Sequence, residues 1–388
     1  MLQPPRSRWK RAAFRMAAHV VRLLHGGGRF SQAELAGIRN FVVLQYESPL
    51  GSVVHATPLF EVLKRALPDC YITVGASTSA ASVLHTSPYI DRCVVTPSPF
   101  KDFSGSVRAV RALLESAPPG ARCVITTIGN QRTRLAVLSI LVGSAARIGY
   151  TLAPELYDLP LVFDPERGQI EGNLDIARSL GHPVPFYEPR VFVSRQDLAK
   201  TEQWLESLEI DPTVPRIVFV TQNSGGQKNQ WRPARFQQVI SGLSSATGAV
   251  PVFVGTEKDT VPIDELRKDL TQKGISLAGK TTITELAALL AQCDLIVSLD
   301  TGTFHVARAV GLPGVVIAPA WQDSREWLPV DDPRYRVLRG PSIRDIPADY
   351  CIDEISVEQV CAAVQTLLTK YPADLAQRDS RVDQSSRR

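Results

Sequence analysis

The sequence lacks an apolar segment long enough to cross a bilayer. Its longest apolar runs, such as residues 135–142, are far shorter than the roughly 20 residues that a membrane-spanning helix needs. The first 30 residues also lack the apolar core and the small-residue cleavage site of a secretory signal peptide. We therefore expect a cytoplasmic protein without a membrane-spanning helix.

Three chemical motifs are missing as well. The six cysteines have neither Cys-x-x-Cys nor His spacing, which argues against a zinc site or a disulfide framework. Because several lie in apolar runs, we expect buried free thiols in a reducing compartment. No Gly-x-Gly-x-x-Gly follows the predicted strands at Phe41 and Ile217, which disfavours a nicotinamide-dependent oxidoreductase. No Asp-x-Asp metal motif stands out.

The N-terminal arm comprises residues 1–37. Its first 30 residues contain seven basic residues and no acidic residue. Removing these seven from the 43 bases leaves 36 against 39 acids, a net charge of −3 for the rest. The arm's apolar residues recur at helical spacing, so a basic amphipathic helix that binds an anionic membrane surface is predicted. The alternative is a solvated or docked helix. Nucleic acid is not an expected partner, because the body has no basic patch in sequence.

The remaining residues alternate between short apolar runs and helical patterns, which is typical of parallel sheets covered by helices. A chain of 388 residues is long enough for two such domains. The predicted parts are the arm (1–37), a first α/β domain (38–182), a proline-rich linker (183–189), a second α/β domain (190–350), a C-terminal helix (351–371) and a disordered tail (372–388). Ser356 is the predicted N-cap of that helix.

A strand–turn–helix–strand unit between residues 294 and 319 is the most informative stretch. Its turn contains the hydroxyls of Thr301 and Thr303, and Gly302 allows a ligand to approach the backbone. The helix that begins there presents free N–H groups, which favour phosphate. Asp300 would repel phosphate, but it suits sugar hydroxyls. A sugar carried on a diphosphate would satisfy both halves of the turn.

The string Asp-Thr-Gly-x-x-His-x-Ala-x-Ala-x-Gly-x-Pro, from Asp300 to Pro313, resembles the donor-site signature of family 9 glycosyltransferases. These are the ADP-heptose lipopolysaccharide heptosyltransferases. Further segments resemble the same family, at residues 51–59, 146–150, 171–174, 277–281 and 284–290. The resemblance implies a GT-B fold, in which two Rossmann-like α/β/α domains face a central cleft. It also implies that the second domain holds the nucleotide-sugar, that the first supplies the base and the acceptor site, and that no metal or other cofactor takes part.

The resemblance further implies a donor-binding set, consisting of Thr221, Lys228, Glu257, Asp300, Thr301, Gly302, Thr303 and His305. Lys228 corresponds to the lysine of a Lys-x-Trp pattern, but here the spacing to Trp231 is one residue longer. It would contact phosphate as a flexible point charge; otherwise it is a solvated loop lysine. Glu257 matches a position that holds the ribose through its hydroxyls; otherwise it is a loop-end charge or an N-cap.

The first domain departs from the family at Ser52, where the family has the aspartate that serves as general base. A serine hydroxyl is a poor base near neutral pH. The titratable neighbours are Glu47, on the preceding loop, and His55, one turn further along the helix. Imidazoles titrate closest to neutrality, although His55 could simply pack or cap. Glu47 is slightly preferred, because its carboxyl resembles that of the missing aspartate.

The predicted function is that of an inverting, metal-independent glycosyltransferase. It would move a sugar, a heptose above all, from a nucleotide diphosphate such as ADP to a lipid-linked saccharide of the lipopolysaccharide-core type. The reaction would occur at the inner face of the inner membrane. The rival hypothesis is a sugar-nucleotide-binding or scaffold protein that has lost its base.

Overall fold

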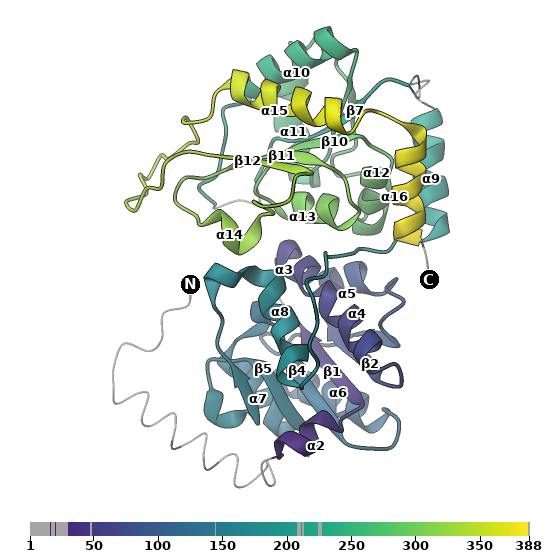
Figure 1. Cartoon of the computed structure of the whole chain (residues 1–388), viewed down its shortest axis with the longest axis vertical. Helices are drawn as coiled ribbons and strands as arrows, with labels where there is room; N and C mark the ends of the chain where they lie inside the picture. The colour runs from purple at the N-terminus through teal and green to yellow at the C-terminus, as the bar shows by residue number, and fades with distance from the viewer. Residues whose placement is uncertain are drawn as a thin grey trace. The chain divides into compact units, whose positions relative to one another are not determined.

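The computed structural model describes residues 30–46, 49–143, 145–207, 211, 213–223 and 227–386, together with residues 16 and 20 of the arm. Most of the predicted arm therefore lies outside the described residues. The chain divides into two compact units, Met1–Pro189 and Arg190–Arg388. Each unit has its own parallel sheet and its own helices (Figure 1).

The sheet of the first unit has six parallel strands in the order β3-β2-β1-β4-β5-β6. The strands are β1 (Asn40–Gln45), β2 (Tyr71–Ala76), β3 (Arg92–Val95), β4 (Arg122–Thr126), β5 (Ala146–Tyr150) and β6 (Leu159–Leu161). Every residue of β1 is buried, as expected of a central parallel strand covered on both faces. This strand order is that of a doubly wound dinucleotide-binding fold.

Helices connect these strands. They are α2 (Gln32–Ala36), α3 (Leu50–His55), α4 (Thr57–Ala66), α5 (Thr78–Leu84), α6 (Phe103–Glu115), η1 (Ile128–Asn130), α7 (Thr133–Leu141), η2 (Pro154–Leu156), η3 (Pro165–Arg167) and α8 (Gly168–Ser179). Two helices, not one, lie between β1 and β2, because Ala56 caps α3 and α4 begins at Thr57. The Thr57 hydroxyl bonds back to the carbonyl of Val54 at 2.8 Å.

The second unit repeats this architecture, with the strand order β12-β11-β10-β7-β8-β9. Its parallel strands are β7 (Arg216–Val220), β8 (Val250–Phe253), β9 (Ile275–Ser276), β10 (Leu295–Leu299), β11 (Gly314–Ala318) and β12 (Tyr335–Arg339). The first strand of the unit, β7, pairs with both β8 and β10. The connections diverge there, and the crevice at the carboxyl ends of such a strand pair is where doubly wound sheets bind ligands.

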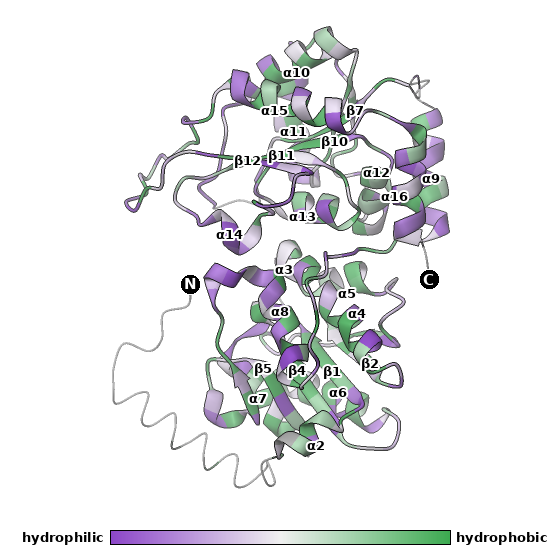
Figure 2. Cartoon of the chain, in the orientation of Figure 1, coloured by the Kyte–Doolittle hydropathy of each residue, from purple (hydrophilic) through white to green (hydrophobic). Residues whose placement is uncertain are grey.

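The helices of the second unit are α9 (Arg195–Glu206), α10 (Pro233–Thr247), η4 (Glu257–Asp259), α11 (Thr260–Lys268), α12 (Ile283–Ala291), α13 (Gly302–Ala309), α14 (Ser324–Trp327), α15 (Val357–Lys370) and α16 (Leu375–Ser386). Ser356 caps α15 as predicted, because its hydroxyl accepts from Gln359 N. Figure 2 shows the central strands predominantly hydrophobic, with hydrophilic residues gathered on the outer helices. No described helix is both long and apolar enough to span a bilayer.

The prediction of a disordered tail at residues 372–388 is wrong for the described residues up to 386, because α16 forms there. Sequence reasoning missed this helix because it has no apolar stripe. Two buried arginines hold it instead. Arg378 pairs with Asp294 through Nε at 2.8 Å and Nη2 at 2.5 Å, and Arg381 donates to the carbonyls of Ala291 and Cys293.

The six cysteines are free, as expected. Cys70, Cys123 and Cys293 are buried, and the other three are partly buried. Burial raises the pKa of Cys70 to about 11 and that of Cys293 to about 12. These thiols therefore stay protonated at neutral pH and act as small apolar side chains.

Candidate active site

The turn between β10 and α13 is the centre of the candidate donor site. Thr301 is the extended N-cap of α13, and its side chain makes no capping hydrogen bond. The first N–H groups of α13 therefore lie at the carboxyl end of β10, where an anion is favoured. Thr301 is 8% exposed, and its Oγ1 has no hydrogen-bond partner among the described residues. Gly302 and Thr303 form the first turn of the helix and are half-buried.

Asp300 lies directly after β10 and is 9% exposed. His305, one turn into α13, approaches its carboxylate with Nε2 at 3.5 Å from Oδ1. The imidazole therefore lies beside the carboxylate at the start of the helix. The ring of His305 also lies beside that of Trp327, with the two ring centroids 6.0 Å apart.

The loop after β7 lies against this turn. Thr221, which begins the loop, is buried at the end of the strand that pairs with β10. Asn229 donates from Nδ2 to the carbonyl oxygen of Asp300 at 2.8 Å, so the last part of the loop is bonded to the candidate donor turn. Sequence reasoning did not select Asn229. The one signal for it was the extra residue between Lys228 and Trp231.

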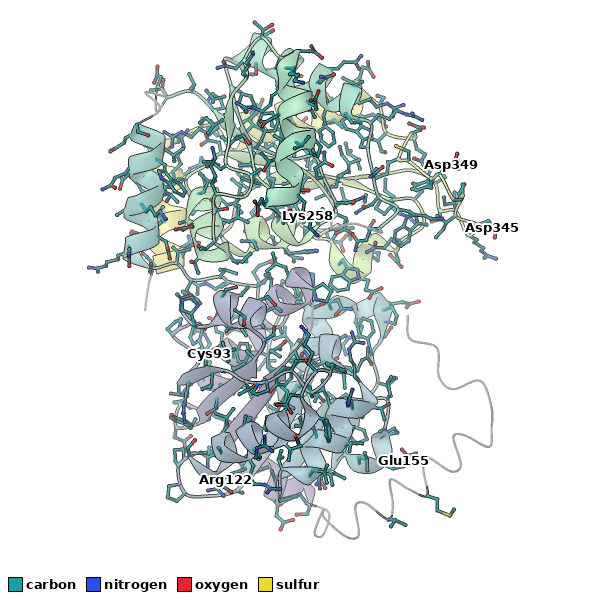
Figure 3. The ribbon with its side chains drawn as sticks, turned by 180° about the vertical axis from the view of Figure 1, so that it is seen from behind. Cys93, Arg122, Glu155, Lys258, Asp345 and Asp349 are labelled. Atoms are coloured by element: carbon teal, nitrogen blue, oxygen red, sulfur yellow. The ribbon has the colours of Figure 1, made fainter. Side chains whose placement is uncertain are left out.

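Lys228 has a different orientation from the one expected of a phosphate ligand. Its Nζ donates to the carbonyl of Pro347 at 2.7 Å, in the loop after β12, and lies 3.5 Å from that of Ile346. Its own carbonyl accepts from Trp321 Nε1 at 2.5 Å, which fixes the backbone. Figure 3 shows that loop projecting at the labelled Asp345 and Asp349. The lysine is held by backbone carbonyls that a phosphate could replace.

Glu257 is the first residue of η4, after β8, and is exposed. Asp259 makes the capping contacts, through Oδ2 to Thr256 N at 2.7 Å, so Glu257 is not needed as a cap. Gly279 packs against it: φ is +70° there, and an added Cβ would lie 2.9 Å from the Cα of Glu257. Because β8 pairs with β7, Glu257 belongs to the same carboxyl edge as Thr221 and Asp300. Lys258, labelled in Figure 3, is its neighbour.

In the first unit, Ser52 and His55 lie one turn apart on α3, and they are 7% and 1% exposed. Ser52 is the third residue of the helix, and Pro49 occupies the N-cap position. The backbone carbonyl of His55 accepts from Asn173 Nδ2 of α8 at 3.2 Å. Glu47, the preferred base, lies outside the described residues.

Tyr46, beside Glu47, is not a rival base. Burial raises the pKa of its hydroxyl, against the opposing effect of hydrogen bonds to Thr96 and Ser106. The phenol stays protonated and bonded to Thr96 Oγ1 at 2.5 Å. Its backbone N–H donates to Asn130 Oδ1 at 2.8 Å, which fixes the exit of β1 where the loop begins.

The other family-like segments of the first unit have packing roles. Arg147 and Asp158 form a fully buried ion pair, with Nη2 and Oδ2 3.1 Å apart. Gly149 has φ of +119°, and an added Cβ would lie 2.1 Å from the carbonyl oxygen of Thr126. Gly172 accepts at its carbonyl from the Tyr150 hydroxyl at 2.7 Å. These residues support the architecture of the first unit.

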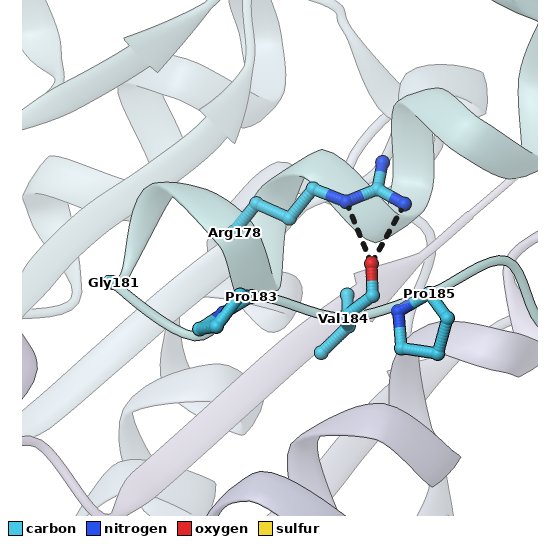
Figure 4. Close-up of a pocket in the computed structure, with 5 residues that line it drawn as sticks. All are labelled: Arg178, Gly181, Pro183, Val184 and Pro185. Carbon is cyan, nitrogen blue, oxygen red and sulfur yellow. Dashed lines mark hydrogen bonds between the residues drawn. The ribbon is translucent and has the colours of Figure 1, made fainter.

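A hollow of about 620 Å³ lies between the end of α8 and the proline-rich segment. Arg178 donates through Nε and Nη2 to the carbonyl of Val184, at 3.1 and 3.0 Å (Figure 4). None of the predicted site residues lines this hollow, so it is not the candidate active site. Among the described residues, no three His, Cys, Asp or Glu side chains are grouped as a metal ion would require.

Residues 134–318 match the model of glycosyltransferase family 9 (heptosyltransferase), a range that includes β10, α13 and the loop after β7. Lipopolysaccharide heptosyltransferase 3 of Escherichia coli K12 is 28% identical over 333 residues, which cover 82% of this chain and 95% of the relative. The chain is thus similar to glycosyltransferase family 9 over residues 134–318. It is a heptosyltransferase-like enzyme, and the resemblance in its sequence is confirmed.

Solved structures agree with this fold. The chain has a TM-score of 0.77 to a glycosyltransferase of family 9 from Veillonella parvula, with 21% identity and coverage of 86% of this chain and 98% of the other. The ADP-heptose lipopolysaccharide heptosyltransferase II of Escherichia coli gives a TM-score of 0.67, with 20% identity and coverage of 85% and 98%. At these identities the likeness concerns the fold, and the predicted GT-B-type pair of parallel α/β sheets is confirmed.

Proposed function

We propose that this enzyme transfers a heptose from ADP-heptose to a lipid-linked saccharide of the lipopolysaccharide core, with inversion and without a metal. The observation that carries the donor half is the hydroxyl of Thr301. It is buried at the start of α13, lacks a partner among the described residues, and follows a carboxylate. A buried polar atom without a partner is costly, and a diphosphate beside a sugar would satisfy this one. The name of the relative from Escherichia coli K12 supports a heptose as the transferred sugar, and the name of the solved heptosyltransferase II supports ADP-heptose as the donor.

In the proposed complex, the N-terminus of α13 and the hydroxyls of Thr301 and Thr303 bind the diphosphate, and Gly302 lets it approach the backbone. Asp300, oriented by His305, accepts hydrogen bonds from the sugar. The remaining contacts come from Thr221 and Lys228 to phosphate and from Glu257 to the ribose hydroxyls. Lys228 would leave the carbonyls of Pro347 and Ile346 to do so.

The proposed reaction is a single displacement. The acceptor oxygen forms a bond to the anomeric carbon while the bond from that carbon to the diphosphate breaks. The developing negative charge on ADP is stabilised by the helix N-terminus and Lys228. The proton of the acceptor hydroxyl passes to a base, for which Glu47 is the first candidate and His55 the second. Ser52 would position the acceptor rather than take its proton.

The proposed site of action is the inner face of the inner membrane, where a lipid-linked acceptor is found. Residues 16 and 20, on the apolar face of the predicted arm helix, are both helical and are 71% and 48% exposed. Exposed apolar residues on an otherwise basic arm support binding to an anionic lipid surface.

A thermal-shift screen of nucleotide-diphosphate sugars tests the donor assignment. A ligand at 100 times its dissociation constant stabilises the folded state by roughly 2.7 kcal/mol. We expect ADP-heptose to raise the melting temperature more than UDP- or GDP-sugars do. Stabilisation by none of them would overturn the proposed donor. Transfer to a deacylated core saccharide, followed by mass spectrometry, then tests the acceptor.

A further inference from the structure

The loop after β7 brings one side chain against the donor turn that the proposed function does not use. Asn229 is 2% exposed. Its Nδ2 donates to the Asp300 carbonyl at 2.8 Å and lies 3.4 Å from Gln227 Oε1. The side chain follows Lys228 in the segment that is one residue longer than the Lys-x-Trp pattern. The segment with one additional residue between Lys228 and Trp231 therefore contains the side chain that contacts the Asp300 backbone.

These two contacts fix the orientation of the Asn229 amide. A backbone carbonyl can only accept a hydrogen bond, and Gln227 presents its own amide oxygen, so the NH₂ group of Asn229 must face both. The Oδ1 atom consequently points away from them. It is buried and has no hydrogen-bond partner among the described residues.

A second unpartnered atom lies at the same turn. Asn229 contacts the carbonyl of Asp300, and the next residue is Thr301, whose buried Oγ1 also lacks a partner among the described residues. Both residues are more than nine-tenths buried, with 2% and 8% of their surfaces exposed. Buried polar atoms are paired in most folded proteins, so two exceptions at a helix N-terminus indicate a place where a ligand supplies the partners.

The chemistry of Oδ1 restricts the ligand group. An amide oxygen only accepts hydrogen bonds, so it requires a donor. The oxygens of an ionised diphosphate are acceptors and would be repelled by it. A hydroxyl group can donate, and a nucleotide-diphosphate sugar offers hydroxyls on its ribose and on the transferred sugar. Because Asn229 is bonded to Asp300, whose carboxylate is assigned to the sugar, the transferred sugar is the nearer source.

We propose that Asn229 binds a hydroxyl of the transferred sugar through Oδ1 while its Nδ2 fixes the loop to Asp300. This inference rests on the proposed donor site and adds to it a residue that distinguishes the sugar from the nucleotide. A donor that lacks the relevant hydroxyl would leave Oδ1 buried and unpaired. Asn229 would therefore select among nucleotide sugars.

The test measures the affinities of three probes, namely ADP-heptose, ADP and inorganic pyrophosphate, for the full chain by calorimetry. Asn229→Leu keeps the size of the side chain and removes both hydrogen-bonding atoms. We expect it to weaken ADP-heptose by about tenfold, the effect of one lost hydrogen bond to a buried group. The affinities for ADP and pyrophosphate should fall less than that for ADP-heptose, because these two probes lack the transferred sugar and are affected only by the loss of the Nδ2 anchor. Gln230→Leu, at the next residue of the loop, which is exposed, is the matched control and should leave all three affinities unchanged.

Each other outcome overturns the assignment. An equal loss for the three probes means that Asn229 only anchors the loop. If the variant binds ADP-heptose and ADP more weakly but pyrophosphate unchanged, Asn229 contacts the ribose and not the transferred sugar. Unchanged affinities of Asn229→Leu for all three probes exclude a contact between Asn229 and the donor but do not contradict the proposed donor. A wild type that binds ADP but no nucleotide sugar instead overturns the proposed function, and the Asn229 assignment with it.

A ligand-side series keeps the proposal testable if Asn229→Leu does not fold. Wild-type affinities for singly deoxygenated ADP-heptoses should include one that is about tenfold weaker. Where the variant folds, that deoxygenation should cost nothing further in Asn229→Leu, as coupled partners require. A series in which no deoxygenation weakens wild-type binding overturns the proposal without any variant.

Discussion

Asp300 is a carboxylate beside a helix N-terminus that is proposed to hold a diphosphate. Asp300→Ala should weaken ADP-heptose by at least about tenfold, because hydrogen bonds to a charged group typically contribute roughly 1.5–3 kcal/mol. Gly302→Val should do the same by blocking the backbone approach. Calorimetry with ADP-heptose measures both effects. Asp349→Ala, on the exposed loop labelled in Figure 3, is the control. Unchanged affinity in a folded Asp300→Ala variant would rule out the donor turn.

The base is a second question at the level of single residues. A positioned base contributes roughly 10²–10⁴-fold to a rate, so Glu47→Gln should lower transfer at least tenfold. Donor affinity should be unchanged, because the proposed donor contacts all belong to the second unit. His55→Gln should have the smaller effect on transfer. Initial rates of heptose transfer, with ADP-heptose affinity measured in parallel, check both variants. Robust transfer by Glu47→Gln would exclude this base.

Ser52→Asp tests the departure from the family. Ser52 is the third residue of α3, where an aspartate is favoured by the helix dipole. We expect the variant to fold and, if wild-type transfer is weak, to raise it. Ser52→Asn is the control for the carboxylate, because asparagine matches aspartate in size but has no charge. A wild type without any transfer that Ser52→Asp rescues would favour the rival hypothesis of a sugar-nucleotide-binding protein that lost its base.

The sequence predicted those site residues that are adjacent to one another along the chain. Asp300, Thr301 and Gly302 are consecutive residues between a strand and a helix, so their common location followed from the pattern alone. Asn229 could not be found in the same way, because its contact with Asp300 joins residues 71 positions apart. The capping role of Asp259, which leaves Glu257 exposed, also depends on rotamers rather than on residue order.

At the level of elements, buried apolar strands were predictable, whereas the edge strands β6 and β12 were not. β1, β7 and β10 are buried along their whole length and read as apolar runs. β6 and β12 are edge strands with partly exposed side chains, so their patterns resemble loops. The polar helix α16 was missed for a related reason, since ion pairs hold it to the unit.

The buried pair of Arg378 and Asp294 makes α16 a stabilising element. Both side chains are less than 5% exposed. Arg378→Met should lower the free energy of unfolding by about 3–5 kcal/mol, because it leaves a buried carboxylate unpaired. Urea unfolding followed by tryptophan fluorescence reports on the second unit, which contains four of the five tryptophans.

Two further variants define this effect. Adding Asp294→Asn to Arg378→Met removes the unpaired charge and should restore part of the stability. The exposed pair of Arg325 and Asp331, 61% and 80% exposed, is the control, and Arg325→Met should cost less than about 1 kcal/mol. Equal losses for Arg378→Met and Arg325→Met would show that α16 is not held by its ion pair.

At the level of the whole molecule, the repeated alternation of strands and helices predicted two sheets, because parallel strands require crossover helices. The arm follows no such rule: its helical spacing indicates an amphipathic helix but not what its apolar face contacts. The separation of charge is the physical clue. The arm has the excess of bases, and the remainder has a net charge of −3, from 36 bases and 39 acids.

Deleting residues 1–30 should therefore leave a folded enzyme that no longer sediments with phosphatidylglycerol vesicles. The full chain should bind them, and binding should weaken with salt, since screening shortens the Debye length from about 10 Å at 0.1 M to about 3 Å at 1 M. Replacing Arg8, Arg11, Arg15 and Arg22 by Gln keeps the apolar face and should abolish most of the binding. Zwitterionic vesicles are the lipid control. Equal sedimentation with and without the arm would mean that the helix is docked or idle, and that the enzyme reaches its acceptor by another surface.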